Sequence, residues 1–215
     1  MTFSLPPLYS FRRCPYAMRA RLGILFAELQ VELREITLKN KPPQMLAISP
    51  KGTVPVLQLS DGRVIEESKE IIEWALEQQD PQGLLDAKVL QQANALIDKN
   101  DKEFKHWLDH YKYADRHPEM TETEYRQRGE GFLQILEALL TKNAYLLGDK
   151  VTIADISIMP FVRQFAHVDR DIFYSLPYPN LQHWLQNWLE HPIFLQVMTK
   201  FQPWQEDDEV VVFPS

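Results

Sequence analysis

The stretch Arg12-Arg13-Cys14-Pro15-Tyr16-Ala17 decides how the first third of this chain folds. The short apolar run before it, residues 8–11, predicts a strand. The segment after it has apolar side chains at helical spacing: Leu22, Leu25, Phe26 and Leu29. Pro15 suits the first position of that helix, where its missing N–H is not needed. Cys14 is therefore predicted at a strand-to-helix turn, at or just before the helix start.

A thiol at this place should be reactive. It meets unpaired backbone N–H groups and the positive end of the helix dipole, and both stabilise the thiolate. Arg12 and Arg13 would add to this effect if either pointed inward. Such a setting can lower a cysteine pKa well below its free value of roughly 8.5. The alternative is that Cys14 is a small, buried, apolar residue that happens to precede a proline.

Bulk composition limits the classes of function. The 215 residues are 45% hydrophobic and 25% charged, enough for one large folded domain or two small ones. A formal net charge of -7 argues against a nucleic-acid partner. We see no signal peptide at residues 1–7 and no run near the ~18 apolar residues of a membrane span, so we expect a cytoplasmic protein without a membrane partner. A single cysteine allows no internal disulfide and fits a reducing compartment.

Residues 1–80 mix strand and helix signals, and the predicted order is β-α-β-α-β-β-α. The predicted elements are a strand at 8–11, a helix at 15–29, a strand at 31–36, a short helix after 42–43, strands at 54–59 and 64–66, and a helix capped by Ser68. Asp61-Gly62 is a hairpin turn signal between the last two strands. Residues 80–83 break the pattern and are predicted to be a linker.

Residues 81–215 are predicted to form an all-helical domain. Apolar stripes at helical spacing run through 89–111, 132–140, 181–188 and 193–201. Thr152 and Asp155 can cap each other at the start of a further helix, in which Pro160 should produce a kink. For the apolar end at 210–213 two outcomes stay open, a segment draped over the fold and a short paired strand.

This arrangement, with Cys-Pro at the first helix, is the thioredoxin pattern, and with an all-helical second domain it resembles the cytosolic glutathione transferases over nearly the whole chain. Four motifs carry the resemblance. Residues 14–17 are similar to the cysteine motif of the omega class and of cysteine-type, glutaredoxin-like bacterial relatives. Residues 38–42 resemble the lysine segment that binds glutathione, 52–57 the segment with a cis proline, and 66–68 the glutamate-serine pair at the third helix.

The resemblance implies a fold and a set of site residues. The fold is an α/β thioredoxin-like domain, residues 1–80, followed by an all-α domain, residues 81–215. Cys14 would be the catalytic nucleophile. Glutathione, as cosubstrate, would be bound by Lys41, Val54, Pro55, Glu67 and Ser68. Lys41 would hold its glycyl carboxylate, the Val54 backbone its cysteinyl part, and Glu67 and Ser68 its γ-glutamyl end.

We expect the second substrate between the two domains. The candidates for its pocket are Tyr16, Asn100, Phe104, Trp107 and Tyr111, with Tyr113, Arg116 and Trp204 as further residues to consider. Packing in the core is the alternative for most of the aromatic ones. The six histidines show no metal-ligand spacing, so no metal is expected.

The sequence therefore favours a glutathione-dependent thiol transferase or reductase that acts by thiol–disulfide exchange at Cys14 on a small disulfide or electrophile. Dithiol relatives have a second cysteine where this chain has Ala17, so an outside thiol must complete the cycle. Two alternatives stay open: a conjugating transferase that uses a hydroxyl such as Tyr9 or Ser10, and a non-enzymatic binding protein. A homodimer is expected from the family alone.

Overall fold

The computed structural model describes residues 5–214; residues 1–4, part of the segment searched for a signal peptide, and residue 215 lie outside that range. The chain forms two compact units. The first contains the residues up to Gln82 together with those from His191 onward, and the second is Gly83–Glu190. The last segment of the chain thus belongs with the first unit, whereas the sequence placed it in the helical domain.

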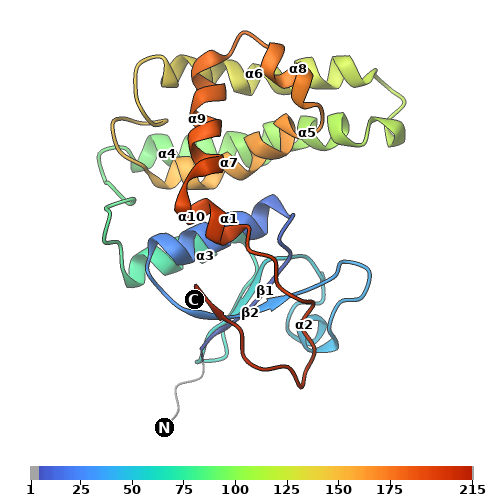
Figure 1. The fold of residues 1–215 in the computed structure, drawn as a ribbon, viewed down its shortest axis with the longest axis vertical. Helices are drawn as coiled ribbons and strands as arrows, with labels where there is room; N and C mark the ends of the chain where they lie inside the picture. Colours follow the sequence, from blue (N-terminus) through green and yellow to red (C-terminus); the bar gives the residue numbers. More distant parts are fainter. Residues whose placement is uncertain (1–4, 215) are drawn as a thin grey trace. The chain divides into compact units, whose positions relative to one another are not determined.

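A five-stranded sheet forms the centre of the first unit, in the order β4-β3-β1-β2-β5. Its strands are β1 (Pro7–Ser10), β2 (Val31–Glu35), β3 (Val56–Gln58), β4 (Val64–Ile65) and β5 (Val212–Phe213). The pair β1 and β2 is parallel, and every other neighbouring pair is antiparallel. With α1 (Pro15–Phe26), α2 (Pro43–Ile48) and α3 (Ser68–Gln78), the predicted order β-α-β-α-β-β-α is confirmed (Figure 1).

The carboxyl-terminal segment adds a helix, α10 (Pro192–Val197), and the edge strand β5 to this unit. Strand β5 pairs with the start of β2, so the paired strand is the outcome that forms. Buried Arg21 of α1 donates to the Val197 carbonyl at 3.0 Å and to the Ser10 hydroxyl at 2.9 Å, and it forms an ion pair with Glu35. Burial lowers the pKa of Arg21. These contacts explain why the tail folds with the first unit.

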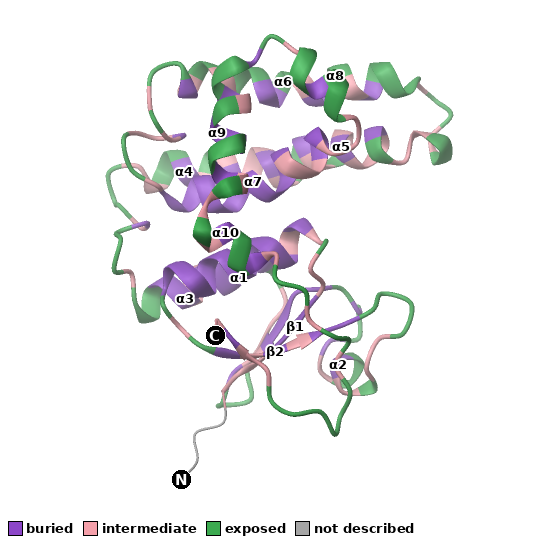
Figure 2. Cartoon of the chain, in the orientation of Figure 1, coloured by how far each residue is buried: buried purple, intermediate pink, exposed green. Residues whose placement is uncertain are grey.

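Helix α1 is buried on nearly all sides (Figure 2), and it packs most closely against α3. The contact is at Gly23. A Cβ atom built there would lie 2.6 Å from Ile72 Cγ1 and 2.9 Å from the Ile72 Cα. Since a backbone atom cannot move without moving α3, only glycine fits at this position.

Gly23→Ala should therefore lower the free energy of unfolding by about 1–3 kcal/mol, the usual cost of overpacking. This loss must exceed the roughly 1 kcal/mol that alanine gains over glycine inside a helix. Gly131→Ala is the matched control, because it is also helical and a Cβ there meets nothing within 4 Å. Denaturant midpoints should fall for the first variant and stay or rise for the second. An unchanged or higher midpoint for Gly23→Ala would contradict the close packing.

The second unit consists of helices. They are α4 (Leu90–Lys99), α5 (Lys105–Lys112), α6 (Glu122–Leu140), α7 (Ile153–Ala166), α8 (Arg170–Ser175) and α9 (Pro179–Glu190), with a π-helical turn, η1 (Asn100–Phe104), and a 3₁₀ turn, η2 (Ala114–Arg116). The predicted stripe at 89–111 runs along α4, η1 and α5, and the π turn begins at the asparagine that interrupts the stripe. Within residues 5–214, no helix combines the length and the apolar character that crossing a bilayer requires.

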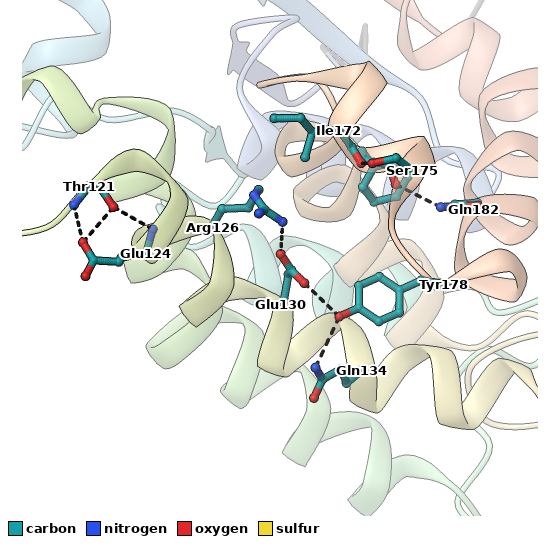
Figure 3. A network of polar contacts seen from close by, with 10 residues as sticks. Thr121, Glu124, Arg126, Glu130, Gln134, Ile172, Ser175, Tyr178 and Gln182 are labelled. Carbon is teal, nitrogen blue, oxygen red and sulfur yellow. Dashed lines mark hydrogen bonds and ion pairs between the residues drawn. The ribbon is translucent and has the colours of Figure 1, made fainter.

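Polar contacts join α6 to the residues before α9 (Figure 3). Glu130 of α6 forms an ion pair with Arg126 and accepts a hydrogen bond from the Tyr178 hydroxyl at 3.0 Å. The Gln134 amide donates to the same hydroxyl at 3.3 Å. At the start of α6, Thr121 and Glu124 form a reciprocal cap. The cap thus fixes the start of α6, and Glu130 and Gln134, one turn apart, attach Tyr178 to this helix.

Asp155 organises the start of α7, as the cap motif predicted. Its carboxylate accepts hydrogen bonds from the Thr152 N–H at 3.0 Å, the Thr152 hydroxyl at 2.9 Å, the Leu146 N–H at 3.0 Å and the Trp184 indole N–H at 3.1 Å. Asp155 is fully buried. Burial raises the pKa of this carboxyl, and the four donors work against that rise. One side chain therefore joins α7, α9 and the loop before α7.

Candidate functional site

Cys14 lies at the N-cap position of α1, and Pro15 is the first helical residue, as predicted. The Cys14 N–H donates to the Phe11 carbonyl at 2.9 Å, which closes a tight turn after β1. The side chain is partly exposed, so the reading of Cys14 as a fully buried core residue does not hold. The backbone N–H groups of the first turn of an α-helix point toward its start, which here is the position of Cys14.

The backbone before Pro55 faces the thiol. The Val54–Pro55 peptide is cis, as the resemblance implied. The Cys14 thiol donates to the Val54 carbonyl, with 3.7 Å between sulfur and oxygen. Val54 belongs to a buried apolar cluster against which Cys14 and Trp204 pack. The predicted nucleophile and the predicted backbone site for a cysteinyl group are thus neighbours.

The two arginines before Cys14 have other partners. The Arg12 guanidinium donates to the Met198 carbonyl at 3.4 Å, and its backbone N–H donates to Glu35 at 2.7 Å. The Arg13 guanidinium lies over the Phe11 ring, 5.4 Å from its centroid. Neither position matches the inward orientation that would stabilise a thiolate directly. The helix start is the feature of the described structure from which we expect stabilisation of a thiolate.

Ser68 occupies a different position from the one expected. It is the first residue of α3, and the N-cap position belongs to Glu67, so the prediction that Ser68 caps the helix is wrong. The Ser68 hydroxyl instead accepts a hydrogen bond from Arg19 of α1 at 3.4 Å. Both residues are buried, with 3% and 1% of their surface exposed. The hydroxyl thus remains at the start of α3, with a cation behind it.

Glu67 is exposed, and Lys41 is partly buried. The Glu67 carboxylate forms an ion pair with Lys51 at 2.7 Å, in which both side chains are well exposed. The Lys41 ammonium lies near Gly52, a buried glycine with φ of +63°. Lys51 and Arg19 were not selected from the sequence. Arg19 could have been noticed because it and Arg21 are the charged residues of an otherwise largely apolar helix.

Comparison with known proteins identifies the family. Residues 8–83 match the N-terminal domain of glutathione S-transferases, and residues 87–187 match their C-terminal domain. The chain belongs to the glutathione S-transferase family. Its fold is the glutathione transferase fold, with a thioredoxin-like unit that contains Cys14 and a helical unit.

Two curated relatives are similar in different ways. A probable maleylacetoacetate isomerase of Caenorhabditis elegans is 27% identical over 213 residues, which cover 94% of this chain and 97% of that protein. Glutathione S-transferase omega-1 of Sus scrofa is 41% identical over 61 residues, 28% of this chain and 25% of that protein. The chain thus aligns with about a quarter of the omega-class relative.

A solved glutathione transferase from Pseudomonas putida has one glutathione disulfide bound per subunit. It is 19% identical, has a TM-score of 0.77 and matches over 91% of both chains. At this identity the likeness supports the fold.

The Tyr9 and Ser10 hydroxyls, the alternatives for a conjugating transferase, both accept hydrogen bonds from arginine side chains. Tyr9 is 1% exposed, and its hydroxyl accepts a hydrogen bond from Arg34 at 2.6 Å. Ser10 is fully buried and accepts from Arg21 at 2.9 Å. Because each hydroxyl is buried against an arginine, neither is presented to a ligand sulfur.

The predicted substrate residues of the helical unit have several roles. Phe104 packs on Phe132 and Phe165, and Tyr111 packs on Phe165, so both are core residues. Burial raises the pKa of Tyr111 to about 12. These contacts place Tyr111 in the core, whereas Phe104 also lines a pocket together with Trp107. The role of both residues toward a substrate stays a prediction. Their spacing on the helix is the same for a core face and a pocket wall, so the sequence could not separate the two.

Trp107, Asn100 and Tyr16 remain candidates. Trp107 lines a pocket of about 200 Å³ on the helical unit, with the Arg128 guanidinium 5.7 Å from its ring. Asn100 is buried, and its Oδ1 has no hydrogen-bond partner in the described part of the chain. Tyr16 is partly exposed beneath the guanidinium of Arg19, 5.6 Å from the ring centroid.

Trp204, a further candidate, takes a defined position. Trp204 meets the Tyr9 ring edge-on at 6.0 Å and lies under Arg34 at 4.4 Å. Its backbone N–H donates to the Glu35 carbonyl at 2.7 Å. Across residues 5–214, no three His, Cys, Asp or Glu side chains are placed to hold a metal ion.

Proposed function

We propose that this glutathione S-transferase family member is a thiol transferase or reductase of the cysteine type. The observation that carries the proposal is Cys14, a partly exposed thiol at the N-cap of α1, beside the Val54 carbonyl. A thiolate at this position is stabilised by the helix start and is accessible to a small disulfide.

The proposed cycle has two exchange steps. The Cys14 thiolate attacks the glutathionyl sulfur of a mixed disulfide, the Cys14–glutathione disulfide forms, and the second thiol leaves as a thiolate that takes a proton. A second glutathione thiolate then attacks the glutathionyl sulfur, which releases Cys14 and forms glutathione disulfide. The chain has a single cysteine, so the thiol that resolves the Cys14–glutathione disulfide must come from solution.

The ligand would lie along the start of α3 and the backbone before Pro55. We propose that the Val54 backbone pairs with the cysteinyl part, and that Ser68 with the first N–H groups of α3 receives the γ-glutamyl carboxylate. Lys41 would approach the glycyl carboxylate. Glu67 would accept from the γ-glutamyl ammonium after exchanging its present partner Lys51.

Isomerisation is the second candidate, and the full-length likeness to a probable maleylacetoacetate isomerase favours it. Isomerisation neither oxidises nor reduces the substrate, so it needs no protein disulfide. The two candidates therefore differ in whether Cys14 becomes covalently linked to glutathione during turnover.

The test is the rate at which iodoacetamide alkylates Cys14 across a pH series, followed by intact mass with and without oxidised glutathione. We expect the midpoint of the rate below roughly pH 8.5, because the helix start stabilises the thiolate. Oxidised glutathione should add one glutathionyl group, and reduced glutathione should remove it. A single cysteine makes the mass assignment unambiguous.

The outcomes separate the alternatives. A thiol that alkylates only above its free pKa, or only after denaturation, would exclude Cys14 as the nucleophile. Alkylation blocked by reduced glutathione, without any disulfide formed from oxidised glutathione, would favour conjugation or isomerisation. Absence of glutathione binding at millimolar concentration would favour a non-enzymatic binding protein.

A further inference from the structure

We propose that Glu35 is a positioning residue, which holds the turn that carries Cys14 in place from the neighbouring strand β2. The inference rests on the proposed function, because it concerns the place from which the thiol would react. It gives a task to a buried carboxylate that the proposed exchange steps do not themselves use. Glu35 would act through the backbone of the turn, where its side chain contacts Arg12.

The first step concerns the unusual place of this charge. The residues of β2 alternate, and Val31, Leu33 and Glu35 lie on its buried face. Glu35 is 8% exposed. A carboxylate is costly to bury unless its oxygens are paired, and a buried ion pair often stabilises a fold no better than apolar residues would. The informative feature is therefore which groups the carboxylate binds.

The second step concerns the two carboxylate oxygens, each of which has its own donor. Oε1 accepts a hydrogen bond from the backbone N–H of Arg12 at 2.7 Å, and Oε2 forms the ion pair with Arg21. Arg12 lies inside the turn that the Cys14 N–H closes onto the Phe11 carbonyl at 2.9 Å. The backbone of the turn is thus fixed both from within and from β2.

The third step concerns Arg21, which orients the carboxylate. Arg21 is fully buried and also donates to the Ser10 hydroxyl at 2.9 Å and to the Val197 carbonyl at 3.0 Å. Ser10 is the last residue of β1 and the register partner of Glu35. The carboxylate therefore cannot rotate away from Arg12 without losing its cation. All these residues belong to the first unit.

The turn decides where the sulfur lies relative to the first N–H groups of α1 and to the Val54 carbonyl, 3.7 Å away. Stabilisation of an anion by a helix start falls off within one helical turn. Reaction also requires that the attacking atom is held in the right geometry. A loosened turn should therefore slow the exchange and raise the pH at which Cys14 becomes reactive, while the proposed glutathione-binding groups stay as they are.

The experiment separates the hydrogen bond to the turn from the ion pair. Three proteins are compared: Arg21→Gln alone, Arg21→Gln with Glu35→Gln, and Arg21→Gln with Glu35→Met. All three lack the ion pair, and in none of them does a guanidinium at position 21 compete for the oxygen of residue 35. The first two keep an acceptor for the Arg12 N–H, whereas methionine has nearly the same length as glutamine and no such acceptor.

The readouts are kcat and KM for the mixed disulfide of glutathione and 2-mercaptoethanol, and the pH midpoint of Cys14 alkylation by iodoacetamide. Relative to Glu35→Gln, Glu35→Met should lower kcat about tenfold and change KM by less than about twofold. It should raise the alkylation midpoint by about half a pH unit. Arg21→Gln alone should resemble the protein that also carries Glu35→Gln.

Glu130→Met is the matched control in the helical unit. Glu130 also forms an ion pair with an arginine, Arg126, and accepts one further hydrogen bond, from the Tyr178 hydroxyl. Its replacement should lower stability and leave both kcat and the alkylation midpoint unchanged. If the Arg21→Gln proteins do not fold, Glu35→Gln is compared with Glu35→Met in the native chain, where both substitutions leave Arg21 without its carboxylate.

Equal kcat for the glutamine and methionine variants at position 35 would overturn the inference, because a purely structural Glu35 would change stability alone. The proposed function would then still stand if the wild type catalyses the exchange. Failure of the wild type to form a Cys14–glutathione disulfide would count against the proposed function itself. The alkylation midpoints need no substrate, so in that case they alone show whether Glu35 fixes the thiol.

Discussion

Replacing Cys14 by serine should reduce glutathione-dependent disulfide exchange by a factor of about 10³ or more, to the rate of the uncatalysed reaction. Serine keeps the size of the side chain and can still donate to the Val54 carbonyl. It cannot form a disulfide, so both steps of the proposed cycle are lost. The effect should fall on kcat rather than on glutathione binding, because the proposed binding groups are unchanged.

The measurement is the initial rate of reduction of a small glutathionyl mixed disulfide, with glutathione affinity measured separately. Arg13→Gln is the control, since this exposed side chain is next to Cys14 in the sequence and lies over the Phe11 ring. Aryl-halide conjugation measured on the same samples tests the competing class. If Cys14→Ser keeps more than about a tenth of the exchange activity, the thiol-transferase proposal is wrong.

Asp155→Ala should lower the free energy of unfolding by at least about 3 kcal/mol. The substitution leaves four buried donors without an acceptor: the N–H groups of Leu146 and Thr152, the Thr152 hydroxyl and the Trp184 indole. Each unsatisfied buried donor costs about 1–3 kcal/mol, and partial relaxation reduces the sum.

Asp169→Ala is the matched control. Asp169 caps α8 by accepting one hydrogen bond from the Ile172 N–H at 2.9 Å, and loss of such a cap typically costs about 1 kcal/mol. Denaturant titrations should be followed by circular dichroism and by tryptophan fluorescence, because a chain of two compact units need not unfold in one step. If Asp155→Ala costs no more than Asp169→Ala, the hydrogen bonds to Asp155 do not stabilise the fold as their geometry indicates.

Local sequence patterns were sufficient for the parts of the molecule that depend on neighbouring residues. Cys14 and Pro15 predicted the start of α1, and Thr152 with Asp155 predicted the start of α7. Such signals work because a helix start is decided by the first four N–H groups and the side chains within one turn of them. The order of strands and helices in the first unit followed in the same way from the spacing of apolar residues, which repeats every 2.0 residues in a strand and every 3.6 residues in a helix.

Only those parts of the candidate site that depend on local sequence patterns could be predicted. Cys14 and the Val54–Pro55 segment were identified, and the structure brings them together. The position of Ser68 was missed by one residue, and its partner Arg19 lies on another helix, 49 positions earlier. The helical spacing of apolar residues is the same on a face that packs in the core and on one that lines a cavity, so the sequence did not show that Tyr111 packs in the core while Phe104 also lines a pocket.

The sequence by itself determined which segments become strands and helices, and that a thiol stands at the start of the first helix. Only the tertiary structure decided where the last segment folds and which charges become partners. Arg21 bonds Val197 across 176 positions, and Arg12 bonds Met198 across 186. Such pairs depend on how the sheet and helices bring distant residues together. The residues close to either partner in the sequence therefore do not predict the pairing.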